Sequence, residues 1–206
     1  MNLDYNEMLE YVKNELLEND LERQRTVKHT FRSRYKHITR VLGWCKRIED
    51  DLECDKDILY TSAIFHDIGY KYGQEEHAVA SSAMFKEYAE KHNFDKEFTE
   101  KVAYNIFHHS EKKLLNDENT SNELILLLEA DLLDEEGALA IVWDLLARGA
   151  KLPKDYHEAL DEIYGFSGKI LDQDFMKTKK AKMYWERKKE FVKNFIDELK
   201  FDLFEE

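Results

Sequence analysis

Apolar residues recur at helical spacing along nearly the whole chain, so the pattern predicts a protein made of α-helices. No segment shows the strict apolar–polar alternation of a half-buried strand. The expected helices cover approximately residues 3–17, 26–49, 56–68, 74–92, 96–109, 122–133, 136–149 and 175–203. Residues 112–122 are polar and predict a loop, and residues 151–168 are less regular.

Helix-breaking residues are scarce, with one proline and seven glycines among 206 residues. This scarcity suits a helical protein, because proline and glycine both disfavour helix interiors. The length suits one sizeable helical domain, and the sequence shows neither a repeat nor an obvious linker. We therefore expect an all-α fold in which residues 1–206 form a single domain.

The formal net charge of −13 changes the set of plausible partners. It argues against a protein that coats DNA, because neutralising phosphates requires clustered lysine and arginine. It does not argue against a metal-dependent enzyme, because a bound cation supplies positive charge locally. The apolar stretches are too short to cross a bilayer, so no membrane partner is expected. Cys45 and Cys54 match neither a zinc motif nor a disulfide framework, and two free thiols fit a cytoplasmic protein.

A few histidines and aspartates fall on apolar helices, where a polar side chain needs a partner. These are His37, the adjacent pair His66-Asp67, and Asp131. Burying such groups is costly unless they are paired or bound to a metal. A mixed set of imidazoles and carboxylates suits Mn, Fe, Zn, Co or Ni better than Ca.

Each of these residues alone has a simpler interpretation. A single mid-helix histidine is usually a satisfied interior or surface residue, and Asp131 can cap a neighbouring helix. His77 and the pair His108-His109 add three imidazoles, but a histidine pair at a helix end is also favoured by the helix dipole. The hypothesis of a metal site therefore depends on the ordered combination.

Three segments in this order resemble the motifs of one family. They are KHITRV at residues 36–41, AIFHDIG at 63–69 and EADLLDEEGA at 129–138. Together they resemble the HD-domain superfamily of metal-dependent phosphohydrolases, in particular its small bacterial members. The resemblance covers approximately residues 27–149, which we expect to form the HD core, with the first and last helices packed on it.

The resemblance implies an HD-type helical bundle and a divalent transition metal held by His37, His66, Asp67 and Asp131. It leaves open whether one or two ions are bound. His77 and His108 are expected at a second ion or at the substrate phosphate, and the role of His109 stays open.

The expected reaction is attack of metal-activated water on phosphorus. Asp67 is expected to be both a ligand and a partner of that water. Arg40, Lys71 and Arg34 are candidates for neutralising charge on the phosphoryl oxygens, although solvated surface charge is an equally good interpretation of them. Asp134 and Glu135 can orient ligands or cap a helix.

The substrate that the family resemblance favours is a nucleotide, cleaved at a phosphoester or phosphoanhydride bond. One alternative is an HD domain that senses a nucleotide without cleaving it, and another is a di-iron HD-type oxygenase. The segment Gly69-Tyr70-Lys71 lacks the acidic residue that several small nucleotide-hydrolysing members carry, which weakens the transfer of their exact substrate. No Gly-Tyr-Pro follows His109, which disfavours a cyclic-dinucleotide phosphodiesterase. The first and last helices can pack within the chain or form a homodimer.

Overall fold

Helices make up the fold of the computed structural model, which describes residues 3–24, 33–148 and 154–204. The elements over these residues confirm the all-α prediction. The α-helices are α1 (Tyr5–Gln24), α2 (Arg34–Ile48), α3 (Lys56–Phe65), α4 (His77–Lys91), α5 (Lys96–His108), α6 (Asn122–Glu135), α7 (Ala138–Arg148), α8 (Tyr156–Gly165) and α9 (Lys179–Asp202). The short 3₁₀ helices are η1 (Glu49–Asp51), η2 (Ile68–Tyr72), η3 (Lys112–Asn116) and η4 (Ser167–Asp172).

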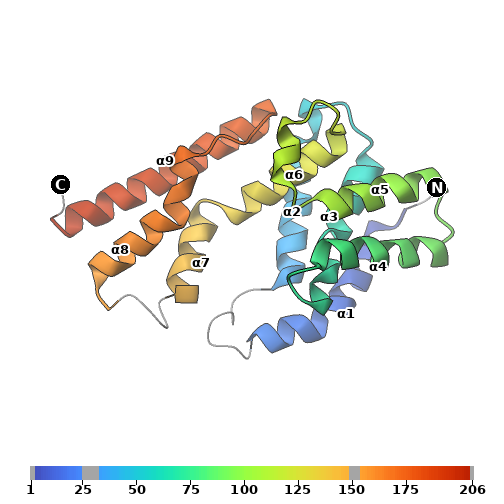
Figure 1. Cartoon of the computed structure of the whole chain (residues 1–206), viewed down its shortest axis with the longest axis horizontal. Helices are drawn as coiled ribbons and strands as arrows, with labels where there is room; N and C mark the ends of the chain where they lie inside the picture. Colours follow the sequence, from blue (N-terminus) through green and yellow to red (C-terminus); the bar gives the residue numbers. More distant parts are fainter. Residues whose placement is uncertain (1–2, 25–32, 149–153, 205–206) are drawn as a thin grey trace.

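The helices form two groups in space (Figure 1). Helices α2, α3 and α6 pack together, α4 and α5 lie side by side, and α1 covers α2, α3 and η2. Helices α7, α8 and α9 extend to the other side, and α9 also contacts α6 and α2. Large side chains such as Phe65, Phe85 and Trp185 are fully buried, so the apolar faces of both groups contribute to one continuous core.

Polar side chains cap the N-termini of helices α2, α3, α5 and α6. The Asp55 side chain accepts hydrogen bonds from two backbone N–H groups of α3, and Asp95 does the same once for α5. Ser121 caps α6 and Ser33 caps α2. Such caps satisfy N–H groups that have no partner within the helix. Asp55, Asp95 and Ser121 therefore stabilise the starts of α3, α5 and α6.

Several predicted boundaries were wrong. Helix α1 continues to Gln24 instead of ending at Leu17, because residues 18–24 contain no helix breaker. Helix α8 lies within a segment that was expected to be less regular, where Asp155 caps it. The expected helix start near residue 26 and helix end at residue 149 lie outside the described residues.

Gly69 brings two parts of the site together. A Cβ atom at this position would lie 2.2 Å from the His77 carbonyl oxygen and 2.5 Å from the Ser81 backbone nitrogen. Only glycine therefore allows η2 to lie directly against α4. This close packing places Asp67, just before η2, opposite His77 at the start of α4.

None of the described helices is both long and apolar enough to span a membrane.

Candidate metal centre

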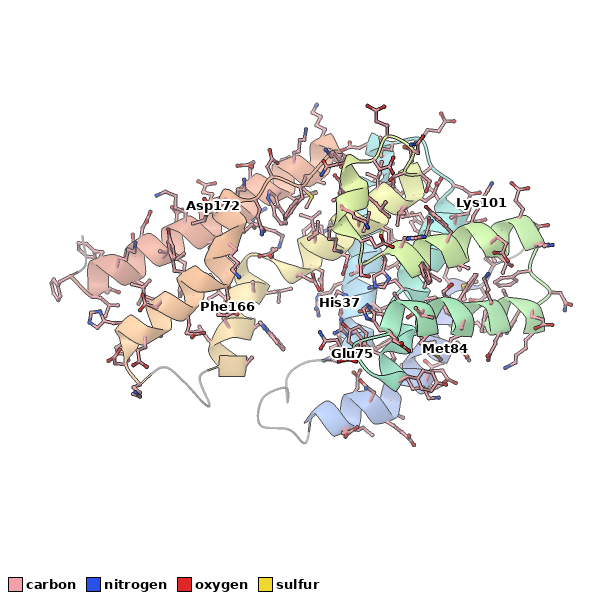
Figure 2. The ribbon with its side chains drawn as sticks, viewed as in Figure 1. His37, Glu75, Met84, Lys101, Phe166 and Asp172 are labelled. Carbon is pink, nitrogen blue, oxygen red and sulfur yellow. The ribbon has the colours of Figure 1, made fainter. Side chains whose placement is uncertain are left out.

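Several helices direct polar side chains toward one point. His37 comes from α2 near the middle of the molecule (Figure 2), and His66 and Asp67 follow the end of α3. His77 begins α4, His109 follows α5, and Asp131 lies on α6. All are buried except His77, which is half-buried. The predicted residues His37, His66, Asp67, His77 and Asp131 are thus close together in space.

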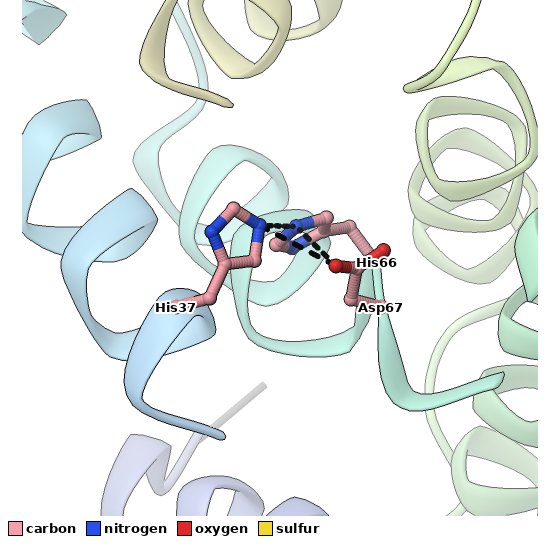
Figure 3. Close-up of side chains that lie close together, drawn as sticks. All are labelled: His37, His66 and Asp67. Atoms are coloured by element: carbon pink, nitrogen blue, oxygen red, sulfur yellow. Dashed lines mark hydrogen bonds and ion pairs between the residues drawn. The ribbon is translucent and has the colours of Figure 1, made fainter. Parts of the chain in front are cut away.

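The first group of ligand atoms surrounds one oxygen of Asp67 (Figure 3). The Nε2 atoms of His37 and His66 are 3.3 Å apart. They lie 3.4 Å and 3.6 Å, respectively, from Oδ2 of Asp67. Oδ1 of Asp131 lies 3.2 Å from Nε2 of His37 and 4.0 Å from Nε2 of His66. Two imidazoles and two carboxylates therefore face a common point.

The second group surrounds the other oxygen of the same carboxylate. Oδ1 of Asp67 lies 3.5 Å from Nε2 of His77 and 3.3 Å from Nε2 of His109. The two Nε2 atoms are 3.2 Å apart. The two geometrically recognised metal-binding groups are therefore His37, His66 and Asp67 on one side, and Asp67, His77 and His109 on the other. Asp67 belongs to both.

The opposite ring nitrogen of each histidine is occupied. The Nδ1–H groups of His66, His77 and His109 donate to the backbone carbonyls of Ala63, Gln74 and Ile106 at 2.6–2.8 Å. Nδ1 of His37 donates to Oδ2 of Asp134 at 2.7 Å. The bonds to carbonyl oxygens place a proton of His66, His77 and His109 on Nδ1, so Nε2 of the neutral ring can bind an ion. Burial lowers the pKa of His37, but its hydrogen bonds to Asp131, Asp134 and Asp67 outweigh burial and hold this pKa well above its ordinary value, so an ion at its Nε2 would displace a proton. The four Nε2 atoms therefore face the two oxygens of Asp67, an arrangement that shared protons or cations would stabilise.

The donor spacings fit a divalent transition metal. Two ligands about 2.1 Å from one tetrahedral ion lie about 3.4 Å apart. The Nε2–Nε2 and Nε2–Oδ distances around His37, His66 and Asp67 are 3.3–3.6 Å, and those around Asp67, His77 and His109 are 3.2–3.5 Å. The mixed nitrogen and oxygen donors also suit such an ion. Both groups therefore pass a test of distance and of ligand chemistry.

The protonation states of His66 and Asp67 favour binding of a metal ion. Burial lowers the pKa of His66 to about 4, so its imidazole is neutral near pH 7. Burial alone would raise the pKa of Asp67, but the surrounding imidazoles and Arg34 hold this pKa well below its ordinary value. Arg34 Nη1 donates to Oδ2 of Asp67 at 2.6 Å, and the guanidinium lies 3.6 Å from the centre of the Tyr70 ring. The carboxylate is therefore ionised and fixed in orientation.

Asp134 supports His37 from outside the cluster. Its Oδ2 accepts from His37, and its two oxygens accept from Nε and Nη2 of Arg40 at 2.8 Å and 2.9 Å. A carboxylate that accepts from a ligating histidine fixes the ring and increases its basicity. The Arg40 guanidinium, predicted to meet phosphate, is thus already paired, although its side chain is 46% exposed and lines the adjoining cavity.

Lys112 holds Asp131 in a similar way, and sequence reasoning missed it. The Lys112 ammonium donates to Oδ2 of Asp131 and, at 3.3 Å, to the His109 carbonyl oxygen. Oδ1 of Asp131 is left to face the imidazoles. The pair also brings a positive charge beside the cluster. The position three residues after a histidine pair at a helix end is the only signal in the sequence that could have indicated this lysine.

The structure does not bring His108 into the cluster. Its Nδ1 pairs with Oε1 of Glu111 at 2.5 Å, and its ring contacts Tyr104. Adjacent helical residues point about 100° apart, so only one histidine of the pair can face inward. That residue is His109, whose role the sequence left open. In the structure His109 faces the cluster, and His108, the expected ligand, does not.

The structure also does not bring Lys71 to the cluster. Its ammonium pairs with Oε2 of Glu15 on α1 at 2.6 Å, and its side chain is 40% exposed. Arg34 instead is the basic residue that contacts Asp67 directly. The expected charge-neutralising role of Lys71 therefore has no geometric support.

A cavity of about 330 Å³ opens beside His37. One wall carries Lys36 and Arg40 from α2, and another carries Asp134 and Glu135 from α6. The third wall is apolar and belongs to α7, with Leu139, Val142 and Trp143. A ligand in this cavity would reach the edge of the first group of donors with an apolar part against α7.

Comparison with known proteins places these features in context. The family model of the HD domain matches residues 34–136, which is half of the chain. A solved HD-superfamily hydrolase from Bacillus thuringiensis is similar over 97% of this chain and 96% of its own, with a TM-score of 0.71 and 21% identity. Bacillus subtilis YpgQ, solved in complex with ADP, is similar over 96% and 94%, with a TM-score of 0.69 and 22% identity.

A predicted HD-superfamily hydrolase from an uncultured Thermotogales bacterium is similar over 91% of this chain and 93% of its own, with a TM-score of 0.58 and 21% identity. Among curated proteins, none matches this chain. At these identities the solved structures show the shared fold alone.

Proposed function

Since this chain belongs to the HD-domain family, we propose that it is a metal-dependent phosphohydrolase that cleaves a phosphoester or phosphoanhydride bond of a nucleotide. One observation supports this more than any other. Four imidazoles direct their Nε2 atoms at a single ionised carboxylate, and each ring is held by a hydrogen bond at Nδ1. This is the arrangement that a metal site requires before the ion arrives.

We propose two ions rather than one. His37, His66, Asp67 and Asp131 would hold the first, and Asp67, His77 and His109 would hold the second. Asp67 would bridge them, because its two oxygens face different groups. A divalent transition metal such as Mn, Fe, Zn, Co or Ni would supply polarisation of a phosphoryl oxygen and activation of water.

The protein's own residues would prepare this chemistry. Arg34 keeps Asp67 ionised and fixes its direction. Asp134 fixes the His37 ring, and Lys112 fixes Asp131 while adding positive charge near the reacting phosphate. Such pre-set groups need no reorganisation when negative charge develops on phosphate.

The cavity beside His37 supports an organic phosphate as substrate. Lys36 and Arg40 would attract phosphate groups, and the α7 wall would accept a ring or another apolar part. A nucleotide combines both features. The complex of the similar YpgQ with ADP agrees with this choice.

The direct test measures metal content and turnover together. Purified protein is reconstituted with Mn, Fe, Zn, Co or Ni and incubated with a panel of nucleotides and other phosphoesters. We expect about two metal equivalents per chain and release of phosphate or pyrophosphate from at least one nucleotide. The variant His66→Ala/Asp67→Ala should do neither.

The matched control is His108→Ala, which removes a nearby imidazole that pairs with Glu111 instead of facing the cluster. It should keep both metal and turnover. Wild-type protein that binds no metal and releases no phosphate would refute the hydrolase. Metal binding without turnover on any compound would favour the nucleotide-sensing alternative, and oxygen uptake by the Fe form would favour the oxygenase.

A further inference from the structure

A second cavity, of about 320 Å³, lies at the other end of α2. Trp44 and Arg47 line it from α2, and Tyr184, Arg187, Lys188 and Phe191 line it from α9. Figure 1 shows the start of α9 near the end of α2. Arg47 follows His37 by ten residues, which is about 15 Å along a helix axis. Arg40 lies between them and is engaged by Asp134, so this cavity is distinct from the one beside the metal cluster.

Aromatic rings form the floor of this cavity, which we call the Trp44 pocket. The rings of Trp44 and Tyr184 meet edge to face, with centroids 5.3 Å apart. The Arg47 guanidinium lies 4.8 Å from the Trp44 centroid, and the Lys188 ammonium lies 5.2 Å from it. Two cations therefore gather around one ring, and Arg187 adds a third.

Two of these three cations, Arg47 and Arg187, lack a carboxylate partner among the described residues. Within the described residues, neither Arg47 nor Arg187 has an ion pair or a side-chain hydrogen bond, and no acidic residue lines the pocket. The chain as a whole carries 44 acidic and only 31 basic residues. Arg47 and Arg187 are exposed, so with Lys188 they form a local positive surface that would attract an anion.

Lys188 is held in place by the backbone. Its Nζ donates to the Glu136 carbonyl oxygen at 2.9 Å. Gly137, with φ of +80°, leaves space for the lysine stem, because a Cβ there would lie 3.0 Å from Lys188 Cγ. Burial, together with repulsion by Arg187 and Arg47, lowers the pKa of Lys188, while Asp134 and Glu136 oppose this. The three cations therefore affect one another, which agrees with their positions around one pocket.

We propose that the Trp44 pocket is a second ligand site that binds a phosphate-bearing anion with a flat ring, such as a nucleotide, independently of the metal cluster. Arginine guanidiniums bind phosphate oxygens through paired hydrogen bonds, and Arg47 and Arg187 have donors free for this. Tyr184 and the exposed Phe191 also line the pocket and offer aromatic surface to a flat ring. The site does not depend on the proposed hydrolase activity, because none of its residues belongs to the cluster.

The test uses ADP as the probe and metal-free protein, prepared with a chelator, so that the cluster does not contribute. Affinity is measured by calorimetry and by quenching of tryptophan fluorescence. We expect wild-type protein to bind ADP more tightly than pyrophosphate, because only ADP carries a ring. Arg47→Ala/Arg187→Ala should weaken ADP binding by about tenfold or more.

The matched control is Lys46→Ala/Lys182→Ala, which removes two exposed positive charges from the same helices outside the pocket. It should change the affinity for ADP by less than about twofold, because exposed charges away from a ligand are screened by salt. Circular dichroism confirms that each variant is folded. The site is refuted if metal-free wild-type protein does not bind ADP, or if the arginine variant binds as well as the lysine control.

Discussion

His37 and Arg47 lie on one helix, yet their surroundings differ in how polar groups are paired. Around His37, the buried imidazoles and carboxylates are hydrogen-bonded on the side that faces away from the cluster. Their remaining nitrogen and oxygen atoms face the centre of the cluster. Around Arg47, the cations contact aromatic rings and a backbone carbonyl, and no acid joins them in the pocket. The first pattern suits a cation, and the second suits an anion. A single helix can therefore present two opposite kinds of site in a protein with a net charge of −13.

The largest expected effect comes from the shared carboxylate of the first region. Asp67→Asn keeps the size of the side chain but removes the charge that faces both groups of histidines. We expect loss of both metal equivalents and a fall in turnover of more than about 100-fold. Metal analysis and phosphate release measure the two effects. ADP binding to the Trp44 pocket should be unchanged, and a parallel loss there would remove the distinction between the two regions.

The two adjacent histidines after α5 give a smaller and more selective effect. His109→Ala should remove the second metal equivalent while the first stays bound, with at least about tenfold lower turnover. His108→Ala should change turnover by less than about twofold, because this ring pairs with Glu111. Metal analysis per chain is the deciding measurement. Equal effects of the two variants would contradict the inward orientation of His109.

The support of His37 by Asp134 is expected to contribute next. Asp134→Asn leaves the first metal site complete but weakens the acceptor for Nδ1 of His37. Metal affinity should fall by about 10- to 100-fold, as is usual for such supporting groups. The control is Glu135→Gln, a neighbouring acid that lines the cavity beside His37 and accepts no hydrogen bond from its ring. Competition with a chelator measures the affinity, and similar values for both variants would contradict this role.

The last prediction concerns folding stability instead of activity, through the pH dependence of Glu136 near the second region. Burial, with help from Glu135, raises the pKa of Glu136 to about 7 from an ordinary value of 4.5. Between these values the folded protein holds a proton that the unfolded chain releases, so wild-type stability falls as the pH rises through this window. Glu136→Gln should therefore be more stable than wild type by about 2 kcal/mol at pH 8 and equal to it near pH 4.5. Urea unfolding at both pH values measures this, and a pH-independent difference would contradict it.

The fold and the core of the cluster were largely predictable from the sequence. Helical periodicity predicted the all-α fold, and polar residues that can cap helices precede α3, α5 and α6 in the sequence. The sequence indicated His37, His66-Asp67 and Asp131, because polar residues on apolar helices are costly to bury without a partner or a metal ion. Their meeting in space follows from helix packing that the family motifs already imply.

What the sequence could not supply were directions of side chains. His108 and His109 are equivalent in a sequence, and only the phase of α5 decides which one faces inward. The pairing of Lys71 with Glu15 and of Lys112 with Asp131 joins residues 56 and 19 positions apart. Such pairs depend on tertiary packing, which no local pattern records. The Trp44 pocket was missed for the same reason, because α2 and α9 are remote in sequence.

The position of Asp67 has a thermodynamic consequence. Since one carboxylate faces both groups of histidines, occupancy of one group changes the free energy of occupying the other, and linkage makes this change equal in both directions. A first ion that fixes the orientation of Asp67 would favour binding of a second ion. A first ion that neutralises part of the carboxylate charge would disfavour binding of the second. The sign of this cooperativity reports which of the two contributions is larger. The steepness of a metal titration would therefore measure how far Arg34 has already fixed the carboxylate.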